Sequence, residues 1–90
     1  MEWKLFADLA ETAGEKRVAV ELQGEATVAD ALEALFEAHP ALRDRVLEDG
    51  KPADHLNLLV DGEDVSGLDG VETRVDSAEE LALFPPVSGG

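Results

Sequence analysis

Alternation of apolar and polar residues predicts two strands at the start of the chain. Residues 2–8 and residues 17–23 each alternate with period two, which is typical of strands that place one face on a core. Residues 13–16 between them are polar and contain glycine, which favours a turn. The two strands are therefore expected to form a hairpin. The residues expected on the core side of the first strand are Trp3, Leu5 and Ala7.

A helix is predicted over residues 28–38. Its apolar residues recur at helical spacing, at Val28, Ala31, Leu32, Leu35 and Phe36. Thr27 and Asp30 precede this run with the spacing of a capping box, in which Asp replaces the usual Glu. Pro40 is expected to end the helix, because the residue before a proline avoids helical dihedral angles.

The remaining chain is predicted to hold shorter elements. Residues 55–60 favour a strand whose orientation the pattern leaves open, because leucines occur at both parities. Val65 is expected to begin a short edge strand, and LALF at 81–84 is expected to be the last strand. Further helical turns are expected within 41–47 and, in a mostly irregular segment, within 66–80.

This order of elements predicts one α+β domain of the β-grasp type. A mixed sheet is expected to pack on one main helix, with the first and last strands adjacent. Ninety residues suffice for one such domain and leave no room for a deep active-site cleft. We expect the domain to cover residues 1–84, followed by a flexible tail at 85–90.

The charge of the chain excludes two classes of partner. It holds 21 acidic and 7 basic residues, which gives a net charge of −14. Nucleic acid and anionic membranes are poor partners for such a chain, since both need clustered Lys and Arg. Adaptation to a very salty cytoplasm and steering onto a basic partner both remain open. Because acidic residues occur along the whole chain, the first explanation is favoured.

Other kinds of chemistry are also missing from the sequence. The chain has no cysteine, so disulfides, thiolate metal sites and side-chain thioesters are impossible. His39 and His55 are too few for a zinc site, and no phosphate-binding loop or Ser-His-Asp signature occurs. We therefore expect no metal, no catalytic side chain and no enzyme activity of its own. No run approaches the ~20 apolar residues of a membrane span, and the N-terminus resembles no signal peptide, which predicts a cytoplasmic protein.

The C-terminal tail is the main candidate for function. After Phe84 the chain reads PPVSGG, and the two prolines favour an extended backbone. Six residues at ~3.3 Å each can carry the terminus up to ~20 Å from the last strand. The two glycines can thread a channel too narrow for side chains. Once adenylated, a C-terminal carboxylate can accept sulfur or be joined to an amine. A Gly-Gly end alone is also typical of a frayed terminus.

A resemblance to known proteins strengthens the first of these interpretations. The string LALFPPVSGG resembles the C-terminus of molybdopterin synthase small subunits and of small archaeal modifier proteins. Both groups belong to the ubiquitin-like β-grasp superfamily of sulfur carriers. KLFADLAETAG, TVADALEAL and AHPAL extend the resemblance over most of the chain. Together with the acidic composition, this is similar to a salt-loving archaeal member of the superfamily.

The resemblance implies roles for particular residues. Gly90 would be adenylated by a ubiquitin-activating-type enzyme that uses ATP, while this chain holds no permanent cofactor. It would then become a thiocarboxylate for molybdopterin biosynthesis, with the large subunit of molybdopterin synthase as a partner, or be joined to target lysines by an isopeptide bond. Phe6 and Phe84 would form an apolar patch that docks on partners. The residues that would thread the partner's channel are Pro85, Pro86, Val87, Ser88 and Gly89.

Two other functions remain open at this point. The chain could be a sulfur carrier only, as the small subunit of molybdopterin synthase, or a β-grasp binding module with an idle tail. The parity of Phe6, opposite to Trp3 and Leu5, favours a surface position. Burial in the core is the alternative for Phe6 and Phe84, since large apolar residues are usually inside.

The excess of acidic residues predicts that the protein is more stable in salt. At 1 M salt the Debye length is ~3 Å, so the repulsion among the carboxylates is largely screened. We expect the melting temperature to rise between low and molar KCl, as measured by circular dichroism. An unchanged melting temperature would contradict the salt-adaptation interpretation.

Overall fold

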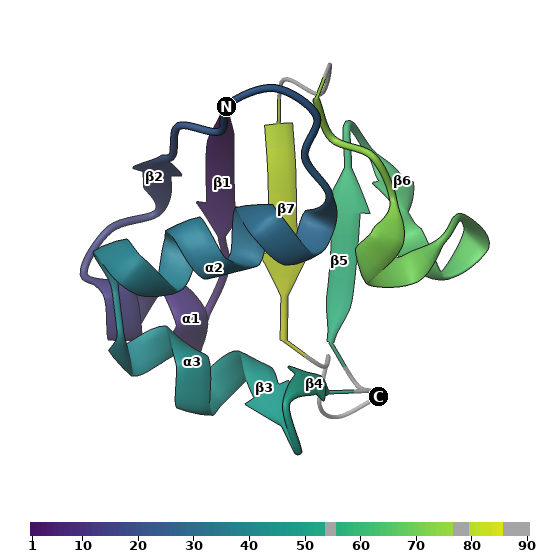
Figure 1. The fold of residues 1–90 in the computed structure, drawn as a ribbon. Coiled ribbons are helices and arrows are strands. Elements are labelled where there is room, and N and C mark those ends of the chain that lie inside the picture. Colours follow the sequence, from purple (N-terminus) through teal and green to yellow (C-terminus); the bar gives the residue numbers. More distant parts are fainter. Residues whose placement is uncertain (54–55, 77–79, 86–90) are drawn as a thin grey trace.

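A five-stranded mixed sheet with one long helix across it forms the protein (Figure 1). The structure, a computed structural model, describes residues 1–53, 56–76 and 80–85. The strand order is β2-β1-β7-β5-β6, and β1 and β7 are parallel neighbours at its centre. This confirms the predicted adjacency of the first and last strands. The strands are β1 (Glu2–Leu5), β2 (Arg17–Ala19), β5 (Asn57–Val60), β6 (Glu63–Asp64) and β7 (Glu80–Phe84).

The pairing of β1 with β7 supplies the middle of the core. Trp3 lies opposite Leu81 and Leu5 lies opposite Leu83, and all four side chains are buried. The indole Nε1 of Trp3 donates a hydrogen bond of 3.0 Å to the backbone carbonyl of Ala31. Since Ala31 belongs to the long helix, this bond fixes the helix against the sheet and satisfies the buried indole.

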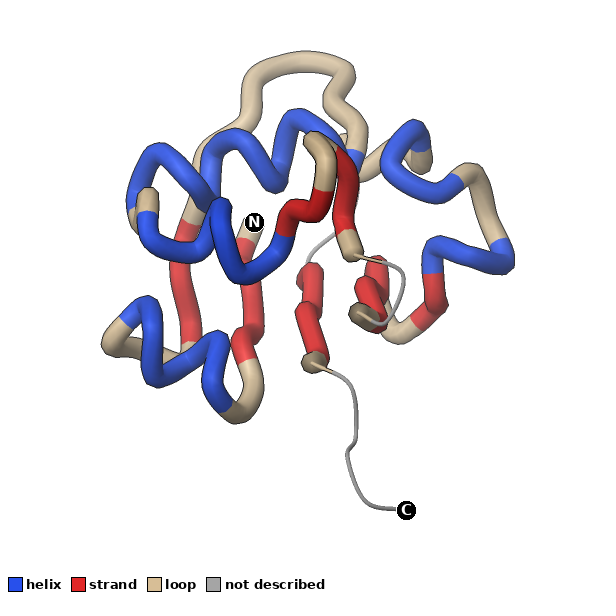
Figure 2. The backbone as a smooth tube through the Cα atoms, turned by 90° about the horizontal axis from the view of Figure 1, so that it is seen from below, coloured by secondary structure: helices blue, strands red, loops and turns tan. Residues whose placement is uncertain are grey.

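The long helix α2 (Val28–Ala38) has the bounds that the sequence predicts. Its capping box is also confirmed, because the Thr27 hydroxyl accepts from the Asp30 backbone N–H and the Asp30 carboxylate accepts from the Thr27 backbone N–H. All five apolar residues at helical spacing are buried. Figure 2 shows α2 lying across one side of the strands, so the other side of the sheet is free of it.

The predicted strand over residues 2–8 is too long. β1 ends at Leu5, and the helix α1 (Asp8–Ala13), which the pattern did not predict, lies between β1 and the expected turn. Ala7 was expected on the core side, but it is exposed and has φ 52° and ψ −130°, which reverses the chain between β1 and α1. Leu9, in α1, is buried instead. The expected antiparallel pairing of β1 with β2 is confirmed, but the connection holds α1 and is not the short polar loop of a hairpin, and β2 ends at Ala19.

Several short elements follow α2. The helix α3 (Ala41–Val46) confirms the expected helical turn, and the small hairpin of β3 (Leu47–Glu48) with β4 (Lys51–Pro52) has no counterpart in the prediction. The predicted strand over 55–60 corresponds to β5. The structure shows which of its residues face the core, because Leu58 and Val60 are buried.

The prediction of an edge strand beginning at Val65 is wrong. The edge strand β6 ends at Asp64, and Val65 begins the 3-10 turn η1 (Val65–Gly67). The Asp64 carboxylate accepts hydrogen bonds from the Ser66 hydroxyl at 2.7 Å and from the Ser66 backbone N–H at 2.8 Å. These bonds start the turn and lower the pKa of the Asp64 carboxyl. A second 3-10 turn, η2 (Gly70–Glu72), confirms helical structure in this segment.

No helix in residues 1–53, 56–76 or 80–85 is long and apolar enough to cross a bilayer.

The backbone at Ala7 predicts a stabilising substitution. A positive φ with this ψ costs a residue with a side chain ~1–3 kcal/mol, whereas glycine adopts it freely at an entropic cost of ~0.5–1 kcal/mol. We expect Ala7→Gly to raise the free energy of unfolding by about 1 kcal/mol in urea denaturation. The matched change Ala29→Gly, at an exposed position in α2, should lower it by up to about 1 kcal/mol. A loss of stability in both variants would contradict this account.

Candidate functional site

The site begins where the tail leaves the sheet. Pro85 is described and half-buried directly after β7, so the base of the tail is defined. The other tail residues to which the sequence assigns a role lie outside the described residues; they are Pro86, Val87, Ser88, Gly89 and Gly90. The geometry of the site is therefore the geometry of β7 and its surroundings.

β7 holds the base of the tail firmly. It pairs with β1 on one side and with β5 on the other, and Leu81 and Leu83 are fully buried. Because β7 is a central strand, its backbone is hydrogen-bonded on both edges, unlike that of an edge strand. The tail therefore starts from a strand that belongs to the core of the domain.

Phe6 and Phe84 stack on each other at the base of the tail. Their ring centroids are 4.1 Å apart and the rings are inclined by 16°. The contact follows from the topology, since β1 and β7 run parallel and end at the same edge of the sheet (Figure 1). Phe6 is 37% exposed and Phe84 is half-buried, so the alternative of core burial is wrong for Phe6. The docking role of the pair stays a prediction.

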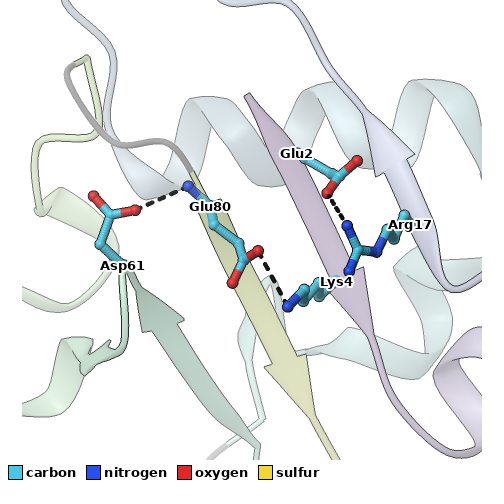
Figure 3. Close-up of polar contacts among 5 residues, drawn as sticks. All are labelled: Glu2, Lys4, Arg17, Asp61 and Glu80. Atoms are coloured by element: carbon cyan, nitrogen blue, oxygen red, sulfur yellow. Dashed lines mark hydrogen bonds and ion pairs between the residues drawn. The ribbon is translucent and has the colours of Figure 1, made fainter.

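Ion pairs cover the same side of the sheet (Figure 3). Arg17 pairs with Glu2 at 3.3 Å, and Lys4 pairs with Glu80 at 3.2 Å. The backbone N–H of Glu80 also donates to the Asp61 carboxylate at 2.9 Å. Both ion pairs join residues from different strands, so spacing along the sequence could not predict them. The sequence does indicate that Lys4 lies on the same face of the first strand as Phe6, because the two residues have the same parity.

Metal binding has no support in the part of the chain that the structure describes. No group of three or more potential ligands comes together there. His39 instead contacts Glu15, with 2.9 Å between Nε2 and Oε2, and His55 is outside the described residues.

The sheet order, the helix across one face and the tail at the end of the central strand define a ubiquitin-like β-grasp protein. The model of the ThiS family matches residues 3–90, and the chain therefore belongs to the ThiS family. It is 55% identical to small archaeal modifier protein 1 of Haloferax volcanii over 91 residues, which cover 100% of both chains. The crystal structure of that protein superposes with a TM-score of 0.90 at 55% identity, covering 100% of this chain and 98% of that one.

Two further structures extend the similarity beyond archaeal modifiers. The chain matches the crystal structure of the Amycolatopsis orientalis BexX/CysO complex with a TM-score of 0.86 at 27% identity, over 99% of this chain and 98% of that one. It matches the putative molybdopterin converting factor subunit 1 of Pyrococcus furiosus with a TM-score of 0.76 at 26% identity, over 96% and 95%. The resemblance found in the sequence is thereby confirmed at the level of the fold and of the family.

The stacked rings predict a small coupling energy. Phe6 is partly exposed, so we expect Phe6→Ala to cost much less stability than the ~3–5 kcal/mol of a buried phenylalanine. A double-mutant cycle with Phe84→Ala should give a coupling of about 0.5–1.5 kcal/mol in urea denaturation. Phe36→Ala, at a position that is 3% exposed, is the control for a buried ring. Equal losses in Phe6→Ala and Phe36→Ala would contradict the surface assignment.

Proposed function

We propose that this chain is a ubiquitin-like modifier and sulfur carrier that works through the carboxylate of Gly90. The observation that carries the proposal is the similarity to small archaeal modifier protein 1 over the full length of both chains. The family match also includes the tail up to residue 90. The rigid base of the tail and the exposed ring of Phe6 beside it support this role.

The chemistry needs an enzyme that activates the terminus. The Gly90 carboxylate attacks the α-phosphate of ATP, pyrophosphate leaves, and the terminus becomes an acyl-adenylate. A sulfide-level sulfur nucleophile then displaces AMP to give a thiocarboxylate, or a lysine amine displaces it to give an isopeptide bond. ATP binds to the activating enzyme, so this chain acts as a substrate and supplies no catalytic side chain.

The proposed partners follow from these two products. An adenylating enzyme of the ubiquitin-activating type receives the tail in both cases, with Phe6 and Phe84 as the docking patch. A thiocarboxylate would pass its sulfur to the molybdopterin precursor in the large subunit of molybdopterin synthase, and an activated carboxylate would be joined to lysines of target proteins. We place this activity in the cytoplasm, where ATP is available.

A carrier that transfers sulfur only is the second candidate. The similarity to the putative molybdopterin converting factor subunit 1 favours it. Under this function the terminus becomes a thiocarboxylate and no lysine conjugate forms. A binding module with an idle tail would form neither product.

Mass spectrometry of the protein from its native host tests these functions. We expect a fraction of the chain to carry sulfur in place of one terminal oxygen at Gly90, and another fraction to be linked to lysines of other proteins. Sulfur without conjugates would leave the carrier as the sole function. Tryptic remnants on targets will be long, because Arg74 is the last basic residue before the tail.

Two variants of the tail serve as controls. Deletion of Gly89 and Gly90 should abolish both products. A chain extended beyond Gly90 by a short tag keeps all native residues but has no free carboxylate there, and it should be equally inactive. If the native protein carries neither sulfur nor a target, and neither variant changes growth of the host, the proposed function is wrong.

A further inference from the structure

A hollow opens at the surface beside Phe6, where β1, α1 and the start of β2 meet. Its volume is ≈ 510 Å³, which is enough for several side chains of a partner. The residues that give it its character are Lys4, Phe6, Ala10, Glu11, Lys16 and Arg17. Three of these residues are cationic and one is anionic, so the lining carries a formal charge of +2.

This charge is the reverse of the rest of the protein. Acidic residues outnumber basic ones by 21 to 7 in the chain, yet three of those 7 basic residues line this hollow. Lys4 and Arg17 are each paired with one carboxylate of the sheet, which leaves free donors on both. Lys16 is exposed and takes part in no ion pair within the described residues. Even with those two carboxylates counted, the region is neutral in a chain of charge −14.

The walls of the hollow are partly apolar. The ring of Phe6 is 37% exposed, and Ala7 and Ala10 add exposed and half-buried methyl groups. Ala7 also carries the positive φ described above, and strained residues cluster at functional sites. An apolar side chain with acidic neighbours therefore fits this hollow better than a purely charged ligand does.

The hollow is continuous with the base of the tail. Phe6 forms part of its wall, and the same ring stacks on Phe84 at 4.1 Å. Phe84 is the last residue of β7, and Pro85 follows it directly. A protein bound in the hollow would thus contact the ring that packs on the last residue before the tail, and six extended tail residues can span ~20 Å from there.

We propose that this hollow binds an acidic segment with one central apolar side chain, carried by the activating enzyme. The inference rests on the proposed function and names the chemistry of the partner's contact. A basic partner would be attracted to every part of this acidic surface, so it would not be oriented. An acidic segment meets an excess of carboxylates over the chain as a whole and three cations here, which favours one orientation. Contacts at short range within the hollow are screened less by salt than interactions between distant surface charges.

Pyrophosphate exchange by the activating enzyme of the same organism tests this contact. With purified full-length chain as the substrate, we expect Lys16→Glu to raise KM roughly tenfold, which is the effect of losing about 1.4 kcal/mol of binding. kcat should change little, because the lost contact is equally present in the ground state and in the transition state. Lys16 is exposed and outside the ion pairs of the described residues, so this variant should fold normally.

Lys51→Glu is the matched control. Lys51 is also an exposed lysine outside those ion pairs, and its substitution changes the net charge by the same amount. It does not line the hollow, so its KM should stay at the wild-type value. Equal KM values in the two variants, whether raised together or both unchanged, would overturn the proposal.

A binding measurement separates this inference from the proposed function. A synthetic peptide with a leucine flanked by glutamates is titrated into the isotopically labelled chain, and amide shifts are followed by NMR. We expect shifts at Ala10, Lys16 and Arg17 that are absent in Lys16→Glu and with a peptide that has lysines for glutamates. Absence of pyrophosphate exchange with the wild-type chain would overturn the proposed function and the choice of partner. Absence of shifts at the hollow would overturn the ligand class.

Discussion

The parallel pairing of β1 with β7 is the constraint on which the rest of the structure depends. It joins the two ends of the sequence at the centre of the sheet, with Trp3 opposite Leu81 and Leu5 opposite Leu83. The indole of Trp3 then fixes α2 through the carbonyl of Ala31. Parallel neighbouring strands need a crossover connection, and here the whole chain between β1 and β7 forms that connection. The core therefore forms only when the chain is nearly complete.

The same pairing positions the parts of the molecule for which a function is proposed. Because both strands end at one edge, Phe6 and Phe84 meet there and the tail leaves beside them. Because α2 covers the opposite side, the sheet face next to the tail stays open to partners. A terminus that must enter another protein's active site gains from this arrangement. It starts at a fixed point, and a force on it is carried by backbone bonds on both edges of β7.

The sequence predicts the elements that local patterns control. The bounds of α2, its capping box and the outward position of Phe6 follow from spacing and parity. The helix α1 could not be predicted in this way, because alternation continues through Ala7 while the backbone reverses there at a positive φ. The hairpin of β3 with β4 consists of two-residue strands, which are too short to show a period. The role proposed for Gly90 rests on resemblance and not on pattern.

The fold also determines how charge is distributed on the surface that is proposed to contact partners. A chain of charge −14 repels other acidic proteins over most of its surface. On the sheet face that bears Phe6, however, Arg17 and Lys4 are paired with Glu2 and Glu80, and Lys16 adds a further cation to the adjoining hollow. This balance exists because β1 lies between β2 and β7, and each neighbour supplies one member of an ion pair. The strand order that builds the core thus also places two neutralised carboxylates and a further cation near Phe6, where carboxylates of a partner meet less repulsion than the net charge implies.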